Sequence, residues 1–163
     1  MKVTFAIIGG GIAGVSCAEQ LAYLAPEESI LLISATSMVK KVTNLNRIAQ
    51  ILNTFDVEER DKEALENDHS NLNVLQGHVI EIDTKKCEII LKSGEIICYQ
   101  YVILCHGARP KLLSNDSFIF GIRDTESVQK FQANLQGARK IVIVGNGGIA
   151  TEMVHELRNG KIS

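Results

Sequence analysis

The strongest constraint on the fold is a pattern that occurs twice: a run of apolar, β-branched residues that leads into closely spaced glycines and then into a helix-like stretch. The first copy is VTFAIIGGGIAGVSCAEQLAYL over residues 3–24, and the second is KIVIVGNGGIATEMV over residues 140–154. A buried strand, a glycine turn and an amphipathic helix form the opening of a β-α-β unit. Two openings in a chain of 163 residues therefore predict two nucleotide-binding units.

The first copy is followed by the rest of such a unit. Residues 3–8 predict a strand, the apolar spacing over 15–24 predicts a helix that ends before Pro26, and SILLIS at 29–34 predicts a buried parallel strand. The connection between the two strands should be right-handed. We expect an α/β fold with a Rossmann-like first domain.

Three glycines of the first copy fit the GxGxxG pattern of a dinucleotide cradle: Gly9, Gly11 and Gly14. The first allows a tight turn, the second lets a pyrophosphate approach the backbone, and the third lets helix and strand pack closely. The N–H groups at the start of the helix then bind the anion. A turn with a purely structural role is the less favoured interpretation.

The residue that usually receives the ribose hydroxyls is an acid about 20 residues beyond the glycines, and here that position is Ser34. Thr36 and Ser37 lie close by. A neutral hydroxyl bonds a ribose more weakly than a carboxylate does, so we expect reduced affinity.

The second cradle has the GxGxxA form, with Gly145, Gly147 and Ala150 after a predicted strand over 140–145. A helix capped by Asp124 or Thr125 should precede it.

Between the cradles we expect three further segments. The apolar spacing over 45–55 predicts an amphipathic helix, and the charged residues 56–70 predict a solvated helix or loop, with an acidic docking surface less favoured. Residues 72–105 contain short alternating segments separated by turn formers, which predicts a small β-meander that ends in a buried strand.

Composition excludes several classes of function. A net charge of -2 without a concentrated basic block predicts no direct nucleic-acid partner. No uncharged apolar run reaches the length that crosses a bilayer, and glycines interrupt the only signal-like stretch. The four cysteines have no zinc-type spacing, so no metal site is predicted, and free thiols indicate a reducing compartment, the cytoplasm or the nucleus.

The order of GGGIAG, the meander, YVILCHGARP, the capped helix and IVIVGNGGIA resembles the two-dinucleotide-binding-domain flavoproteins of the pyridine nucleotide-disulfide oxidoreductase family. The resemblance covers the whole chain. It implies FAD in the first cradle, NADH or NADPH in the second, and hydride transfer from nicotinamide to flavin.

The resemblance also implies site residues. The FAD pyrophosphate would meet Gly9, Gly11, Ile12, Ala13 and Gly14. The backbone of Val79 would touch adenine, and Gly107 would pass close to FAD in a turn where Cys105 and His106 replace the usual residues.

Three other positions stay open. Lys40 matches a lysine that lies near the flavin in relatives, and the interpretation as an ordinary surface lysine is equally favoured. For His106, a turn residue is favoured over a catalytic base. Arg123 and Asp124 are favoured for capping or interdomain pairing. The sequence leaves the catalytic residues unknown.

One departure from the family pattern is chemical. Disulfide reductases of the family carry a CxxxxC pair after the second strand, and SMVKKVTNLNRIAQIL contains no cysteine. A parent enzyme would pass electrons from reduced flavin to oxygen, a quinone or a protein acceptor, and the resemblance implies a role in the response to oxidative stress.

The family pattern also continues beyond the second glycine turn. We expect residues 1–114 to be the N-terminal part of an FAD-binding domain and 115–163 the start of an incomplete NAD(P)-binding domain, in a truncated chain with low cofactor affinity. The function expected is that of an FAD-dependent NAD(P)H oxidoreductase. The alternative is a non-catalytic module that binds a dinucleotide or a protein partner, and an NAD-only dehydrogenase is disfavoured.

Overall fold

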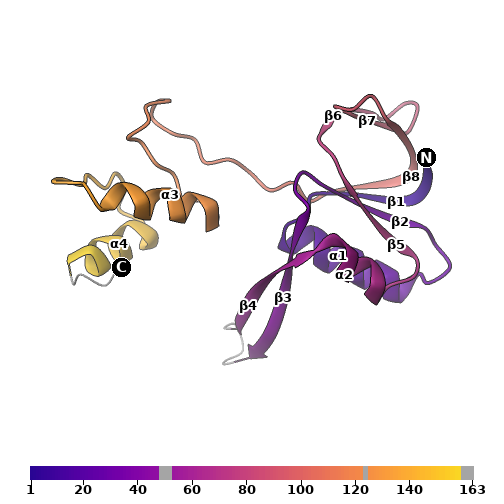
Figure 1. Ribbon diagram of the computed structural model, residues 1–163, viewed down its shortest axis with the longest axis horizontal. Helices are drawn as coiled ribbons and strands as arrows, with labels where there is room; N and C mark the ends of the chain where they lie inside the picture. Colours follow the sequence, from indigo (N-terminus) through magenta and orange to yellow (C-terminus); the bar gives the residue numbers. More distant parts are fainter. Residues whose placement is uncertain (48–52, 123–124, 159–163) are drawn as a thin grey trace. The chain divides into compact units, whose positions relative to one another are not determined.

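The computed structural model describes residues 1–47, 53–122 and 125–158. The chain divides into two compact units, Met1–Gly107 and Ala108–Ser163, here called unit 1 and unit 2. Figure 1 shows a sheet with helices in unit 1 and helices with extended segments in unit 2.

Unit 1 is built on a six-stranded sheet with the strand order β5-β2-β1-β8-β7-β6. Four strands are parallel neighbours: β5 (Leu72–Gln76), β2 (Ile30–Ser34), β1 (Lys2–Ile8) and β8 (Ile96–Leu104). The strands β6 (Val79–Asp83) and β7 (Glu88–Leu91) continue the sheet in antiparallel pairing. The expected α/β fold with a Rossmann-like parallel sheet is confirmed.

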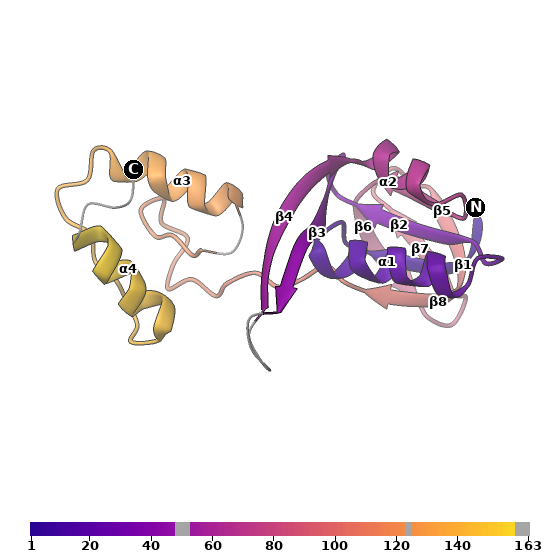
Figure 2. The same ribbon diagram turned by 90° about the horizontal axis from the view of Figure 1, so that it is seen from below.

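The core lies on both faces of this sheet because strand side chains alternate. On one face, Ile7 and Leu32 pack with Val15 and Ala18 of α1 (Ile12–Leu24). On the other face, Ala6 and its neighbours pack with residues of β7 and β8. Figure 2 shows α1 running along the strands. The sheet is thus covered on each side, as a parallel sheet requires.

The prediction of an amphipathic helix over 45–55 is wrong. A hairpin occupies this region, with β3 (Met38–Arg47) antiparallel to β4 (Asn53–Asp61), and residues 48–52 lie outside the described part. The spacing of apolar residues fitted a helix, but the β-branched residues Val39, Val42 and Val57 favour a strand. Val42 lies opposite Val57 in the ladder.

The charged segment 56–70 therefore begins in β4 and then forms α2 (Lys62–Asp68). The solvated helix expected there is only partly correct, because Leu65 is buried in the core of unit 1.

Ion pairs fasten the hairpin to the helices. Lys41 of β3 pairs with Glu19 of α1 and, at 3.7 Å, with Asp68 of α2. Arg60 of β4 lies 3.6 Å from the same Asp68. These side chains are partly exposed, so each pair contributes modestly, on the order of 1 kcal/mol or less.

The expected β-meander over 72–105 needs two corrections. The first segment, β5, pairs with β2 as a parallel strand and does not belong to the meander. The last two segments form the single strand β8, whose start pairs with β7 and whose remainder pairs with β1. This last strand is also less buried than expected, because Tyr101 and Leu104 are exposed.

Unit 2 contains α3 (Thr125–Leu135) and α4 (Gly148–Arg158). The strand expected over 140–145 is absent from the described structure, since this stretch has no β-pairing. A strand needs a neighbour to satisfy its backbone groups, and no other strand is described in unit 2. Phe120 and Phe131 meet edge to face with ring centroids 6.3 Å apart.

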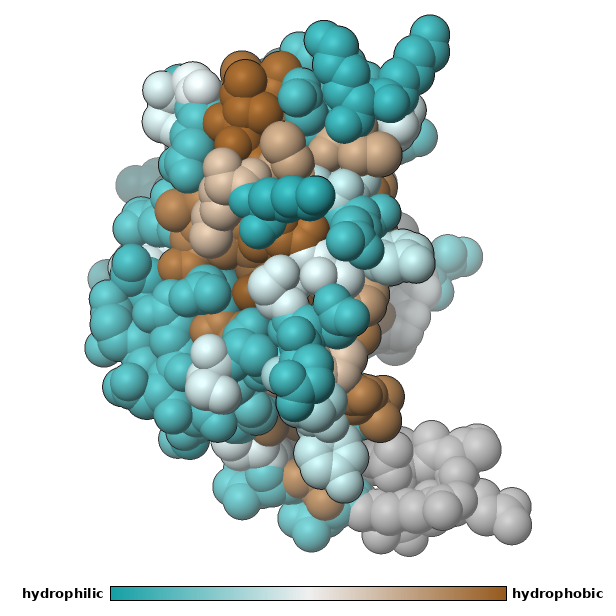
Figure 3. Space-filling view, turned by 90° about the vertical axis from the view of Figure 1, so that its right-hand side faces the viewer, coloured by the Kyte–Doolittle hydropathy of each residue, from teal (hydrophilic) through white to brown (hydrophobic). Residues whose placement is uncertain are grey.

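The surface is mixed in character. Figure 3 shows one face that is mainly hydrophilic, with a band of hydrophobic residues between the polar ones. No helix in the described ranges is long and apolar enough to cross a membrane.

Candidate functional site

The candidate site is the glycine turn between β1 and α1, at the carboxyl edge of the parallel strands. Gly9 has a backbone φ of +122°, a conformation that residues with a side chain rarely adopt. A Cβ there would also overlap the backbone carbonyl of Cys105, just after β8. Gly9 is therefore required both by its backbone angle and by the close approach of the neighbouring strand.

Gly14 is required for a different reason. A Cβ at this position would overlap the carbonyl oxygen of Gly9, so the first turn of α1 packs directly on the loop. This matches the role predicted for the third glycine of the motif.

Gly11 is different from both, because a Cβ built on it would meet no protein atom within 4 Å. Its surroundings are open, as the approach of a ligand phosphate requires. Gly11 is also the N-cap of α1 and supplies no side-chain hydrogen bond, and no acidic residue lies in the first turn. The N–H groups of Ile12 and Ala13 are thus placed at a positive helix end that can receive an anion.

The neighbouring backbone holds the loop in place. The N–H of Gly9 donates to Ile33 O at 2.8 Å, and the N–H of Lys40 donates to Gly10 O at 2.9 Å. The N–H of Cys105 donates to Ile8 O at 2.8 Å, so β8 ends beside the loop. Gly107 follows with φ +67°. The sequence motif, β3 and the turn after β8 therefore come together at one edge of the sheet.

Ser34 lies at the end of β2 with only 2% of its surface exposed. Its Oγ would overlap a Cβ built on Gly10, and it accepts a hydrogen bond from the N–H of Thr36 at 3.3 Å. The Ser34 side chain therefore packs directly against the glycine loop at Gly10. The predicted contact between Ser34 and a ribose stays a prediction.

Lys40 extends from β3, and its Nζ lies 3.3 Å from Glu59 Oε1 across the hairpin. The pairing fits the interpretation of an ordinary lysine at the surface, and the alternative position near a flavin stays a prediction.

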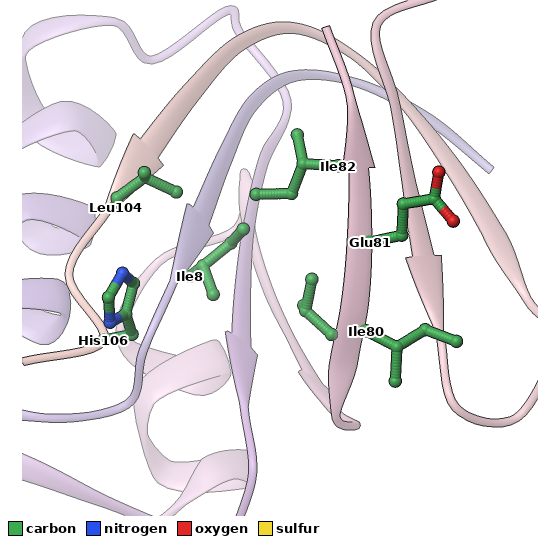
Figure 4. A pocket seen from close by; sticks show the side chains of 7 residues that line it. Ile8, Ile80, Glu81, Ile82, Leu104 and His106 are labelled. Atoms are coloured by element: carbon green, nitrogen blue, oxygen red, sulfur yellow. The ribbon is translucent and has the colours of Figure 1, made fainter. Parts of the chain in front are cut away.

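A shallow cavity of about 370 Å³ lies at the same edge of the sheet, next to the turn after β8. It is lined by Ile8, Leu104, His106 and residues 79–82 of β6. Figure 4 shows Ile8, Leu104 and His106 close together, with the carboxylate of Glu81 pointing away from the imidazole. Val79, the predicted adenine contact, thus lines a largely apolar hollow, and its contact with adenine stays a prediction.

The second predicted cradle has a similar geometry in unit 2. Gly145 has φ +134°, and a Cβ on Gly147 would meet no atom within 4 Å. A Cβ on Gly145 would lie 3.8 Å from the Cβ of Ala150, an ordinary contact, so the first and third motif positions are less tightly packed here than Gly9 and Gly14 are in the first loop. The turn leads into α4, where the N–H of Thr151 donates to Gly147 O at 3.1 Å.

Sequence reasoning missed the roles of Gly10 and Cys105. Gly10 is needed because Ser34 packs against it, and the backbone of Cys105 forms the wall behind Gly9. The run of three glycines was the available signal for Gly10. The sequence marked Cys105 only as a replacement for a usual turn residue and gave no role for its backbone. Arg123 and Asp124 lie outside the described residues, and no cluster of potential metal ligands occurs in the part that the structure describes.

These features define a dinucleotide-binding fold, and comparison with known proteins gives the family. The model of the pyridine nucleotide-disulphide oxidoreductase family matches residues 3–161. The chain belongs to this family. Family membership and fold support the two cofactors expected from the sequence, FAD and NAD(P)H.

Among curated relatives, the chain is 44% identical over 162 residues to pyridine nucleotide-disulfide oxidoreductase domain-containing protein 1 of Danio rerio, covering 99% of this chain. It spans only 33% of that relative's length.

Two solved structures have the same fold. A ferredoxin reductase from Rhodopseudomonas palustris superposes with a TM-score of 0.74 at 20% identity, over 97% of this chain and 40% of the other. The NADH:rubredoxin oxidoreductase from Clostridium acetobutylicum gives 0.64 at 21% identity, over 98% and 42%.

Proposed function

We propose that the chain is part of an FAD-dependent NAD(P)H oxidoreductase and that unit 1 holds the adenosine diphosphate half of FAD. The observation that carries this proposal is the loop of residues 9–14. It combines three glycines that leave no room for a side chain, Gly9, Gly10 and Gly14, with one, Gly11, that faces open space beside the positive end of α1.

The residues that would hold the cofactor have separate roles. The N–H groups of Ile12 and Ala13 would donate to the diphosphate, and Gly11 would allow it to approach. The backbone of Val79 would contact adenine, and the turn at Gly107 would lie along the cofactor. The cavity at β6 supports the position of the adenine.

Unit 2 would contribute the second nucleotide site. Gly145, Gly147 and Ala150 would hold the diphosphate of NADH or NADPH at the start of α4, by the same use of helix N–H groups. Bound FAD would supply the chemistry by accepting hydride from the nicotinamide.

We further propose that the protein is not a dithiol reductase. The sequence has no cysteine over residues 35–52, where disulfide reductases of the family carry their redox pair. Oxygen, a quinone or a protein would then be the electron acceptor. An enzyme of this kind would serve in the response to oxidative stress, in the cytoplasm or nucleus, the reducing compartments that free cysteines indicate.

The experiment is a titration of the full chain with FAD, followed by flavin fluorescence, with ADP and adenosine as competitors. Because the loop recognises a diphosphate, ADP should displace FAD and adenosine should not. Anaerobic addition of NADPH or NADH should then bleach the flavin absorbance of the holoprotein. Absence of FAD binding would refute the assignment of unit 1, and FAD binding without bleaching would refute the assignment of unit 2.

A second candidate, a non-catalytic interaction module, is favoured by the apolar surface of unit 2, where Leu113, Phe118 and Val142 are each more than three-quarters exposed, at 78%, 81% and 84%. The same titration separates the two candidates, because a module needs neither flavin nor hydride transfer.

A further inference from the structure

Two of the four cysteines lie together behind the glycine loop. Cys17 is on α1 and Cys105 follows β8, and both are partly buried against the apolar cluster that α1 shares with the sheet. Of the other two, Cys87 directly precedes β7 and Cys98 lies in β8. Neither Cys17 nor Cys105 has a side-chain role in the proposed cofactor site.

The helix geometry places Cys17 and Cys105 near neighbouring positions of α1. The Cβ of Cys105 lies 3.4 Å from the position that a Cβ on Gly14 would occupy. Cys17 follows Gly14 by three residues, and side chains three apart are neighbours on a helix face. Cys17 therefore lies one helical turn from the position that Cys105 approaches, and both side chains pack against the same apolar cluster.

The electrostatics agree with this proximity. Burial raises the pKa of the Cys17 thiol, and a negative charge on Cys105 raises it further. Such an interaction fits two thiols that pack against the same partly buried cluster, where charges are weakly screened.

We propose that Cys17 and Cys105 are a redox-sensitive thiol pair that glutathione disulfide converts into an intramolecular disulfide. One thiolate attacks a sulfur of glutathione disulfide, which forms a mixed disulfide and releases one glutathione thiolate. The second protein thiol, after losing its proton to solvent, attacks the mixed disulfide and releases the second glutathione. Two protein thiols are oxidised, and one glutathione disulfide is reduced to two thiols.

The bridge would tie α1 to the turn that carries Gly107. The carbonyl of Cys105 already forms the wall behind Gly9, so the bridge would fix the helix and the wall of the loop to each other. The proposal does not depend on what the loop binds.

The test uses the full chain with Cys87→Ser and Cys98→Ser, which leaves only the proposed pair. After incubation with glutathione disulfide, intact mass spectrometry should show a loss of about 2 Da, the mass of two hydrogens, restored by a reductant. Tryptic digestion without reduction should yield residues 3–40 linked to residues 93–111, which contain Cys17 and Cys105 respectively.

The matched control adds Cys17→Ser to this background. It should take up one glutathione on Cys105 and form no internal bridge. If the double variant fails to fold, the wild-type digest decides, because fragmentation of residues 93–111 tells a bridge at Cys105 from one at Cys98. Stable glutathione adducts on both thiols, thiols that stay unmodified in the folded chain, or a bridge to any other cysteine would overturn the proposal.

Discussion

Replacing Gly11 with alanine should separate cofactor binding from folding. The backbone of Gly11 has φ -78° and ψ 179°, which alanine adopts without strain. The added methyl group meets no protein atom within 4 Å, so the free energy of unfolding should change by no more than about 0.5 kcal/mol.

The effect on the cofactor should be much larger. The methyl group would occupy the space through which a diphosphate reaches the N–H groups of Ile12 and Ala13. Loss of one hydrogen bond to a charged group costs about 1.5–3 kcal/mol. At about 1.4 kcal/mol per factor of ten, FAD affinity should fall about 10- to 100-fold.

The assay pairs calorimetric titration with FAD and thermal unfolding of the same preparations. Gly137→Ala is the matched control, because a Cβ there also meets no atom within 4 Å and the position lies outside both glycine loops. The control should match wild type in both measurements. Unchanged FAD affinity in Gly11→Ala would refute the phosphate role of the loop, and a large loss of stability would refute the geometry described for Gly11.

Four further outcomes are expected. Gly14→Ala should destabilise unit 1 by about 1–3 kcal/mol in urea unfolding, because its methyl group overlaps the Gly9 carbonyl; a stability equal to wild type would contradict this packing. Leu65→Ala should cost about 2–5 kcal/mol in the same assay, since Leu65 is 1% exposed, whereas the exposed Leu24→Ala should cost little. Lys41→Met should lower stability by about 1 kcal/mol or less, and the difference from wild type should shrink in high salt because the ion pairs are screened. The raised pKa of Cys17 means that the folded state favours the protonated thiol. The contribution of this thiol to stability should therefore be complete below the ordinary thiol pKa and lost as pH rises through the raised pKa. A Cys17→Ser variant whose melting temperature has the same alkaline pH dependence as wild type would contradict this prediction.

The glycine loop could be predicted from the sequence because its requirements are local. A positive φ at Gly9 and close packing at Gly14 leave few alternatives to glycine, and the flanking strand and helix fix the context. The order of elements in the first 34 residues was predictable for the same reason.

The hairpin at β3 and β4 was not predictable in this way. Its apolar spacing fits two periods, and the choice between them depends on contacts with α1 and α2 that are distant in sequence, such as those of Lys41. The position of Ser34 beneath Gly10 is likewise a packing outcome that no motif describes. The parallel pairing of β5 with β2 depends on the whole sheet being present.

The pairing of β1 with β8 also has a consequence for biosynthesis. The strand β1 leaves the ribosome well before β8, its partner on one side, which ends at Leu104. Until then one edge of β1 stays open, and the wall behind Gly9 does not exist. The glycine loop can therefore reach its folded form only after Cys105 has been synthesised.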